Sequence, residues 1–286
     1  MATSATSEQL LVVIDPVARR TDSESVRIAK DVLSAGAATK VCLPDSPEEF
    51  ARALARRGSR RPVVIGDDRA LIRAVSVLHR QRELAGCALS LVPVGSAQSL
   101  ARSLGVPAGA VAAARAALEG AERRLDLLVD DSDGVVLGAL RIPPVRADPW
   151  QADPEEAPAG AAGHPWLRTC QSLVRTLVPA RPSRVASAPV AGPSRLRVEV
   201  DGETLVDLDQ PVEAVSVTPG AAGVAEVEVR PVSVGAEASP LLARGRTVTV
   251  SGAHFRYRAD ATVSGPVGIR TWTVREEALG LVLPGR

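Results

Sequence analysis

The sequence predicts an α/β fold plus a β fold: an N-terminal doubly wound parallel sheet, followed by a C-terminal antiparallel β-sandwich. In the first half, short apolar runs alternate with helix-length amphipathic segments, which is typical of parallel sheets. In the second half, short strands of alternating polarity follow one another with turn residues between them. A chain of 286 residues with 45% hydrophobic residues is long enough for two domains with aliphatic cores.

Apolar runs in the first half are the predicted parallel strands. Leu10–Ile14 is continuously apolar, as expected for a strand that is buried on both faces. A stripe of apolar residues, followed by Gly36, predicts a helix over Glu24–Ala35. The other predicted strands are Ala38–Leu43, Pro62–Ile65 and Leu89–Val94, and the other predicted helices begin at Ser46-Pro47 and span Ala70–Leu84.

Three turns follow predicted strands at the edge of the sheet where ligands usually bind: Asp15–Arg19, Gly66–Arg69 and Gly95–Gln98. After the third turn a helical segment begins at about Gln98 and is closed by Gly105. The first amides of a helix lack partners and attract anions, so this turn is a candidate phosphate site. The alternative is that it only connects a strand to a helix.

The second half begins with a predicted strand at Val135–Ile142. A stretch rich in Pro, Ala and Gly over residues 143–194 is typical of a loop insertion, in which Leu167–Leu177 could form a short amphipathic helix. The final apolar segment, Ala278–Leu283, is a further strand. The other strands of the second half are predicted at Arg195–Val200, Glu203–Leu208, Val212–Thr218, Val224–Val234, Thr247–Ser251, Phe255–Val263 and Arg270–Val274.

Composition argues against several classes of function. A net charge of +1 with interspersed signs gives no footprint for nucleic acid. Three scattered cysteines and three scattered histidines show no spacing for a zinc site or a disulfide framework. The chain shows neither a signal-peptide pattern nor an apolar run long enough for a transmembrane segment, which favours a cytoplasmic protein.

The turns share a pattern with a known family. Asp15-Pro16 corresponds to an Asn-Pro turn, Ile65–Arg69 to a Gly-Gly-Asp-Gly-Thr turn, and Pro93–Arg102 to Pro-Leu-Gly-Thr-Gly-Asn-Asp-Phe-Ala-Arg. Arg124–Leu127 is similar to a Val-Asp-Leu segment that leads into the second domain. In order and spacing these segments resemble the catalytic domain of the diacylglycerol kinase family, bacterial lipid kinases related to sphingosine kinases.

The resemblance implies an N-terminal nucleotide-binding domain at residues 1–127, to which residues 276–286 return, and a β-rich substrate-side domain at 128–275. It also implies ATP and Mg²⁺ as cofactors, and a nucleotide and a lipid at a membrane surface as partners. Asp67 is the implied catalytic residue, and Asp67 and Asp126 are the implied metal ligands. The implied cofactor-binding residues are Asp15, Gly66, Asp67, Asp68, Arg69, Gly95, Ser96 and Gln98.

Several positions depart from the family pattern. Asp68 replaces a glycine of the phosphate loop and brings a negative charge, while Arg69 replaces a threonine. Ser99 replaces an aspartate. In the late turn that carries the family's general base, Val263–Pro266 places Ser264 where an aspartate is expected, and Asp260 is a candidate substitute.

These departures favour a diacylglycerol kinase-family protein with weak or lost phosphotransferase activity. The first alternative is an active ATP-dependent lipid kinase that phosphorylates a diacylglycerol- or sphingoid-like hydroxyl. The second alternative is a non-catalytic ligand-sensing or partner subunit. A dinucleotide-dependent dehydrogenase is disfavoured because no GxGxxG follows the first strand.

Overall fold

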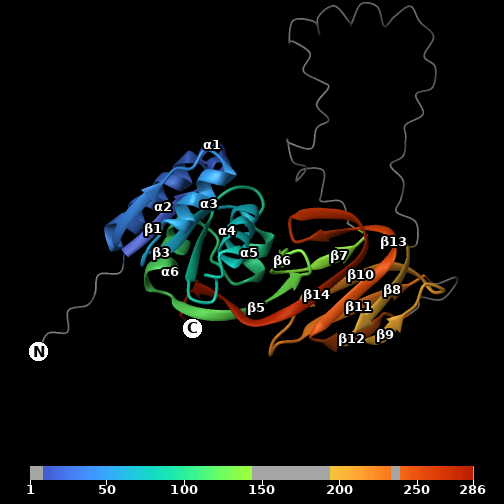
Figure 1. Cartoon of the computed structure of the whole chain (residues 1–286). Coiled ribbons are helices and arrows are strands. Elements are labelled where there is room, and N and C mark those ends of the chain that lie inside the picture. Colours follow the sequence, from blue (N-terminus) through green and yellow to red (C-terminus); the bar gives the residue numbers. More distant parts are fainter. Residues whose placement is uncertain (1–8, 144–193, 233–238, 286) are drawn as a thin grey trace, which may run out of the picture. The chain divides into compact units, whose positions relative to one another are not determined.

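The computed structural model describes residues 9–143, 194–232 and 239–285 (Figure 1). Its strands form one hydrogen-bonded network with the main order β12-β11-β10-β7-β13-β14-β4-β3-β1-β2. The sequence pattern had suggested a separate sandwich for the second half. The strands of the two halves are joined because β14 pairs with β4 as well as with β5 and β13.

Parallel strands form the first half of this network. The strands are β1 (Gln9–Ile14), β2 (Ala38–Cys42), β3 (Arg61–Gly66) and β4 (Ala88–Pro93), and β1 lies between β2 and β3. Alternate residues of β1 enter two different cores, since Leu10 and Val12 belong to one cluster and Leu11 to the other. Burial on both faces explains why β1, β3 and β4 are apolar runs, whereas β2, at the edge of the sheet, is largely exposed.

Helices cover both faces of this sheet. Residues of α2 and α6 share a core with β1 and β3 on one face, and residues of α3, α4 and α5 line the other core. This is the doubly wound arrangement that the alternating pattern predicted. The helices are α1 (Pro16–Thr21), α2 (Ser23–Gly36), α3 (Pro47–Ala55), α4 (Asp68–Arg80), α5 (Ser99–Ser103) and α6 (Ala110–Glu119).

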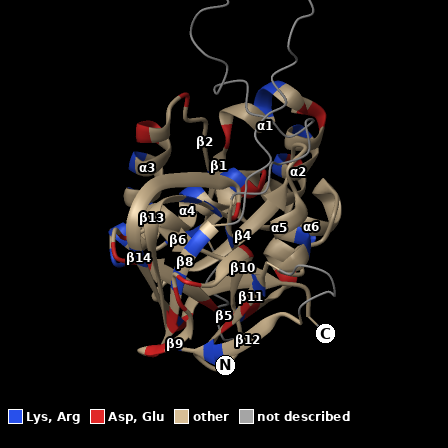
Figure 2. Cartoon of the chain, turned by 90° about the vertical axis from the view of Figure 1, so that its right-hand side faces the viewer, with Lys and Arg blue, Asp and Glu red and all other residues tan. Residues whose placement is uncertain are grey.

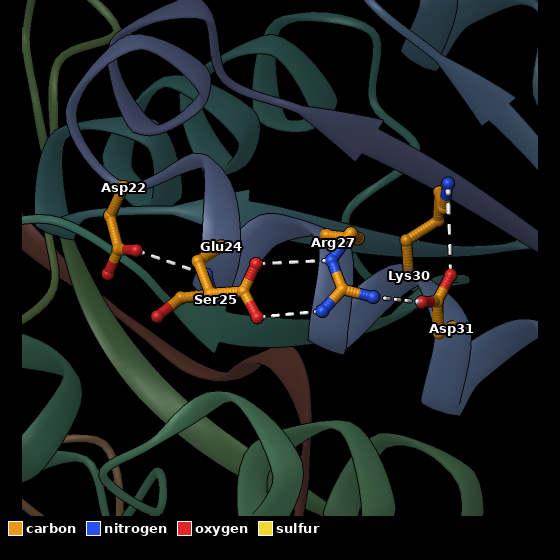
Figure 3. A network of polar contacts seen from close by, with 6 residues as sticks. All are labelled: Asp22, Glu24, Ser25, Arg27, Lys30 and Asp31. Atoms are coloured by element: carbon orange, nitrogen blue, oxygen red, sulfur yellow. Dashed lines mark hydrogen bonds and ion pairs between the residues drawn. The ribbon is translucent and has the colours of Figure 1, made fainter.

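Local polar contacts define the first turns of α2. The Asp22 carboxylate accepts a hydrogen bond from the Ser25 amide, which caps the helix. Arg27 then pairs with Glu24 one turn before it and with Asp31 one turn after it, as Figure 3 shows. These exposed pairs add only modest stability.

Antiparallel strands form the rest of the network and surround a third core, which includes Trp272 and Tyr257. Buried residues alternate with more exposed ones along much of β13, and in β14 they do so around Trp272 and Val274. The strands are β5 (Ala121–Asp130), β6 (Val135–Val136), β7 (Leu140–Ile142), β8 (Ser194–Val200), β9 (Glu203–Val206), β10 (Pro211–Pro219), β11 (Ala225–Pro231), β12 (Leu241–Gly245), β13 (Thr247–Ala259) and β14 (Thr262–Leu283).

The structure corrects several predicted boundaries. The expected strand Val135–Ile142 is divided into β6 and β7 by the loop at Leu137–Ala139. The expected turn at Val263–Pro266 lies within β14, and the β13–β14 turn is at Asp260 and Ala261 instead. Helices α1 and α6 and strand β12 were not expected from the pattern. The predicted insertion at 143–194, with the helix proposed within it, falls almost entirely outside the described residues.

In the part of the chain that the structure describes, no helix is long and apolar enough to cross a membrane. Cys42 and Cys87 are free thiols, and Cys170 lies outside the described residues.

Candidate functional site

The three predicted turns meet at the carboxyl ends of β1, β3 and β4. The Asp15 amide donates to the Ile65 carbonyl, and the Val94 amide donates to the Gly66 carbonyl, both over 2.9 Å. The Asp68 amide donates to the Ala97 carbonyl over 2.8 Å. The parallel strand order therefore brings together residues that are 28 to 50 positions apart in sequence.

Gly66 is required where the first two turns touch. A Cβ atom at this position would lie 2.6 Å from the Ala70 Cβ and 3.0 Å from the Asp15 Cβ. Gly95 has a φ of +118°, and a Cβ there would lie 3.3 Å from the Asp67 Cβ. The small residues of these turns thus serve close packing of the three strand ends.

Asp15 is buried and fully engaged at this edge. One carboxylate oxygen accepts the Val17 amide and caps α1, and the other accepts Arg73 Nη1 over 2.6 Å. The Arg73 guanidinium also lies over the Phe50 ring, 5.5 Å from its centroid. Asp15 therefore holds α1 to α4 through a paired charge.

Asp67 is the N-cap of α4. Its Oδ1 accepts the amides of Arg69 and Ala70 over 3.1 and 3.2 Å. Burial raises the pKa of this carboxyl group, the capping amides oppose the rise, and the nearby Asp15 charge adds to it. The residue predicted to be catalytic thus has a clear structural role.

Asp68 is the most informative residue of the site. Its side chain is buried, and its two oxygens accept the amides of Leu100 and Ala101, each over 2.9 Å. The Ser99 hydroxyl donates to the same carboxylate over 3.3 Å. These are the first amides of α5, the donors that the sequence had suggested for a phosphate. The Asp68 carboxylate occupies them from within the chain.

The remaining residues of the third turn are less buried. Ser96 is exposed, and Gln98 Nε2 donates to the Gly95 carbonyl over 2.7 Å, which closes the turn on itself. Arg69 lies in the first turn of α4 and is partly buried. Arg69 directly follows Asp68, and Gly95 lies beside Asp67, since a Cβ on Gly95 would be 3.3 Å from the Asp67 Cβ. A role for these residues, Ser96 and Gln98 in binding a cofactor stays a prediction.

Asp126 has a separate set of partners. Its oxygens accept the amides of Gly223 and Glu277, each over 2.7 Å, opposite the bulge that β14 forms between Arg275 and Leu279. None of these contacts involves Asp67. Asp126 thus stabilises a neighbouring bulge, and the expectation that Asp67 and Asp126 bind a metal stays a prediction.

Asp260 connects the β13–β14 turn to the loop between β6 and β7. Its carboxylate accepts the amides of Leu137, Gly138 and Ala139 over 2.7, 2.8 and 2.9 Å. Burial raises the pKa of Asp260, the three amides oppose this, and the Asp68 charge adds to the rise. A Cβ on Gly138 would lie 3.0 Å from Asp260 Oδ1 and 2.8 Å from Leu100 Cδ1, so Asp260 lies close to the start of α5.

Ser264 does not occupy a turn. It lies in β14 opposite Tyr257, whose hydroxyl donates to the Asp130 carboxylate over 3.2 Å. The resemblance had placed the family's late turn at these residues, and Ser, Gly and Pro are common in turns. Strand pairing instead continues past these residues, and Asp260, with a φ of +49°, takes the turn position.

The helix end that the sequence had suggested for a phosphate is already occupied, and binding of ATP and Mg²⁺ stays a prediction. The amides of Leu100 and Ala101, predicted for a phosphate, already bind the Asp68 carboxylate. Across the described ranges there is no group of three or more His, Cys, Asp or Glu side chains arranged to hold a metal ion. The site instead contains several carboxylates that accept hydrogen bonds from backbone amides, and two of them, Asp15 and Asp68, are buried.

Comparison with known proteins identifies the first part of the chain. Residues 9–129 match the family model described as the diacylglycerol kinase catalytic domain. This stretch is therefore similar to the catalytic domain of the diacylglycerol kinase family. The match includes all three turns and Asp126, and it confirms the resemblance that the motifs suggested. No curated protein matches the chain.

Solved structures extend the similarity beyond the catalytic domain. A crystal structure described as a candidate diacylglycerol kinase from Bacillus anthracis has a TM-score of 0.68 and 13% identity, covering 97% of this chain and 98% of that one. Another, described as a diacylglycerol kinase from the same organism, has a TM-score of 0.65 and 11% identity, covering 97% of each chain. At these identities the similarity shows the fold alone.

Some residues of the site could not be expected from their motifs. Arg73 lies on α4 and pairs with Asp15, 58 residues away. The loop Leu137–Ala139 contains no polar side chain, so its three amides gave no signal of a carboxylate partner. The one usable signal was at Asp260, since aspartate tolerates the left-handed conformation of a turn.

Proposed function

We propose that this chain is a diacylglycerol kinase-family protein in which ATP-dependent phosphotransfer is weak or lost. The proposal rests on one observation: the Asp68 carboxylate accepts hydrogen bonds from the backbone amides of Leu100 and Ala101. The resemblance assigns a glycine to this position, where a bare backbone could approach a phosphate. Such a protein would act as a ligand-sensing or partner subunit, that is, as a pseudokinase.

Charge and hydrogen bonding both support the proposal. A phosphate that approached α5 would have to displace a carboxylate already bound by two amides and a hydroxyl. Without displacement, two anions would lie close together in a partly desolvated site, where repulsion is much stronger than in water. Displacement would leave the Asp68 charge buried, which is also costly.

A second candidate function, an active lipid kinase, is favoured by Asp260. Its carboxylate lies close to the start of α5, since a Cβ on Gly138 would be 3.0 Å from Asp260 Oδ1 and 2.8 Å from Leu100 Cδ1. A carboxyl group with a raised pKa is a suitable acceptor for the proton of a lipid hydroxyl. The three amides that Asp260 accepts already use part of its capacity, which favours a structural role for this residue.

The test is phosphate transfer from radiolabelled ATP to diacylglycerol or a long-chain base in detergent micelles with Mg²⁺. The proposal predicts little or no labelled lipid with the natural chain and increased labelling with Asp68→Gly. Asp68→Asn is the matched variant, because it removes the charge but keeps an acceptor oxygen. Turnover by the natural chain in the range common to kinases, about 1–100 s⁻¹, would contradict the proposal.

If the natural chain is active, Asp260→Asn tests the second candidate. Loss of a general base typically lowers the rate by about 10²–10⁴-fold. An unchanged rate with this variant would leave Asp260 a purely structural residue.

A further inference from the structure

Two neighbouring segments of the first half concentrate positive charge. Residues 52–61, at the end of α3 and in the loop that leads into β3, and residues 80–86, at the end of α4 and in the loop before β4, together contain seven arginines and a single acidic residue, Glu83. The whole chain has 34 basic and 33 acidic residues, so everything outside these segments is net negative. Figure 2 shows basic and acidic residues, in blue and red, interspersed over the molecule. The two segments therefore depart from the pattern of the rest of the chain.

The two segments lie side by side at one edge of the sheet. β3 and β4 are adjacent parallel strands, in which Val63 pairs with Ser90, so the loops that lead into them lie at the same edge. An ion pair between Arg57 and Glu83 joins the two loops directly. α3 and α4 also share one hydrophobic core. Residues 52–61 and 80–86 thus form one surface, which we call the arginine surface.

Three exposed arginines of this surface have no internal counter-ion. In the described ranges, no carboxylate lies at ion-pair distance from the side chains of Arg56, Arg80 and Arg82. The only acidic residue of the surface, Glu83, pairs with Arg57 instead. The charges of the three exposed arginines are therefore open to a partner.

Other negative groups nearby do not offset this charge. Arg124 of β5 donates to the Ala85 carbonyl over 2.7 Å, and the carboxylate beside it, that of Glu122, pairs with Arg124 itself. The C-terminal ends of α3 and α4 each carry about half a negative charge. Together they offset about one arginine, whereas the surface has seven arginines and one carboxylate. The arginine surface thus keeps a surplus of positive charge.

The composition of the surface indicates the class of partner. It contains no aromatic side chain that could stack on a base, and its two leucines, Leu54 and Leu84, are buried, so it offers no large apolar group to a bilayer. Guanidinium groups bind carboxylates strongly, through two parallel hydrogen bonds. The partner that this chemistry fits is an acidic protein segment.

We propose that the arginine surface binds an acidic protein segment, whose Asp and Glu carboxylates pair with Arg56, Arg80 and Arg82. The surface lies at the amino ends of β3 and β4, whereas the candidate site lies at their carboxyl ends. The six residues of β3 separate the two by about 20 Å. A partner bound here leaves the strand-end turns open, so the proposal goes beyond the proposed function and does not depend on it.

The test uses a short, fluorescently labelled oligoglutamate peptide, which is titrated with the full chain at low ionic strength and followed by anisotropy. The proposal predicts saturable binding that weakens as salt is raised, because the contacts are exposed ion pairs. An oligolysine of the same length should not bind. An oligothymidylate of the same charge should bind more weakly than oligoglutamate, because the surface lacks the aromatic side chains that support binding of single strands. No ATP is needed, so the result is independent of phosphotransfer.

Variants locate the binding surface. A surface ion pair contributes a factor of about 1.4–5 to binding, so Arg56→Gln with Arg82→Gln is expected to weaken oligoglutamate binding about 2–25-fold. The control is Arg20→Gln with Arg115→Gln, which removes the same charge from exposed positions on α1 and α6. The control should weaken binding less than about 1.5-fold, because charges outside the contact are screened.

Three results would overturn the proposal: no binding of oligoglutamate, equal losses in the two double variants, or tighter binding of oligothymidylate that Arg56→Gln with Arg82→Gln also weakens. Circular dichroism of each variant shows whether it is folded. If Arg56→Gln with Arg82→Gln does not fold, Arg80→Gln decides, and unchanged oligoglutamate binding by that variant would contradict the proposal.

Discussion

Replacing Asp68 with alanine should destabilise the protein because this carboxylate joins α4 to α5. The change removes the acceptor for two buried amides at 2.9 Å and for the Ser99 hydroxyl. Loss of a helix cap costs about 0.5–2 kcal/mol, and a buried amide left without a partner costs about 1–3 kcal/mol. We expect a loss of about 2–4 kcal/mol in the free energy of unfolding, near the middle of the summed ranges.

Urea unfolding of the full chain, followed by circular dichroism, measures this loss. With a slope of about 3 kcal/mol/M, the midpoint should fall by about 1 M. Asp68→Asn keeps one acceptor oxygen and should lose about half as much. Asp31→Asn on α2 is the control, because its carboxylate is exposed and makes only surface ion pairs. An Asp68→Ala midpoint equal to that of the control would refute the reasoning.

Three further predictions concern other residues of the site. The pKa of Asp260 is raised above 3.8 in the folded chain, so the folded state binds this proton more tightly than the unfolded state does. The free energy of unfolding of the natural chain, compared with that of Asp260→Asn, should therefore fall as pH rises from 3.8 through the raised pKa. Urea unfolding of both proteins across this pH range measures the difference, and a difference that does not change with pH would contradict the prediction. Gly66→Ala should destabilise the folded protein by about 1–3 kcal/mol, because the new Cβ would lie 2.6 Å from the Ala70 Cβ. Gly86→Ala is the control, since a Cβ there has nothing within 4 Å, and it should leave the stability unchanged. Differential scanning calorimetry of both variants measures the difference. Asp126→Ala should speed hydrogen exchange at the amides of Gly223 and Glu277, which donate to this carboxylate, and leave any Mg²⁺ affinity unchanged. Loss of Mg²⁺ affinity in this variant would show that Asp126 is a metal ligand.

Much of the parallel sheet could be predicted because its strands are buried on both faces. Runs such as Leu10–Ile14 need no information from distant residues to be read as strands. The meeting of the three turns then follows from strand order, since the carboxyl ends of parallel strands lie at one edge. Helix α6 was missed because its alanine-rich sequence has a weak contrast between its two faces.

The details of the site depended on tertiary contacts that no local pattern records. The sequence indicated that Asp68 brings a negative charge to the loop, but not that it binds amides 32 and 33 residues away. The late turn was misplaced because strand pairing overrides the local turn residues at this position. Ser264-Gly265-Pro266 has strong turn residues, yet the pairing of Tyr257 with Ser264 keeps it within the hairpin and moves the turn to Asp260.

The most direct test of the account is a calorimetric titration of the natural chain and of Asp68→Gly with ATP in the presence of Mg²⁺. If the Asp68 carboxylate fills the phosphate position, the natural chain should bind with a Kd above about 1 mM, and the variant should bind at least about tenfold more tightly. Micromolar binding by the natural chain, unchanged by Asp68→Gly, would contradict the central claim.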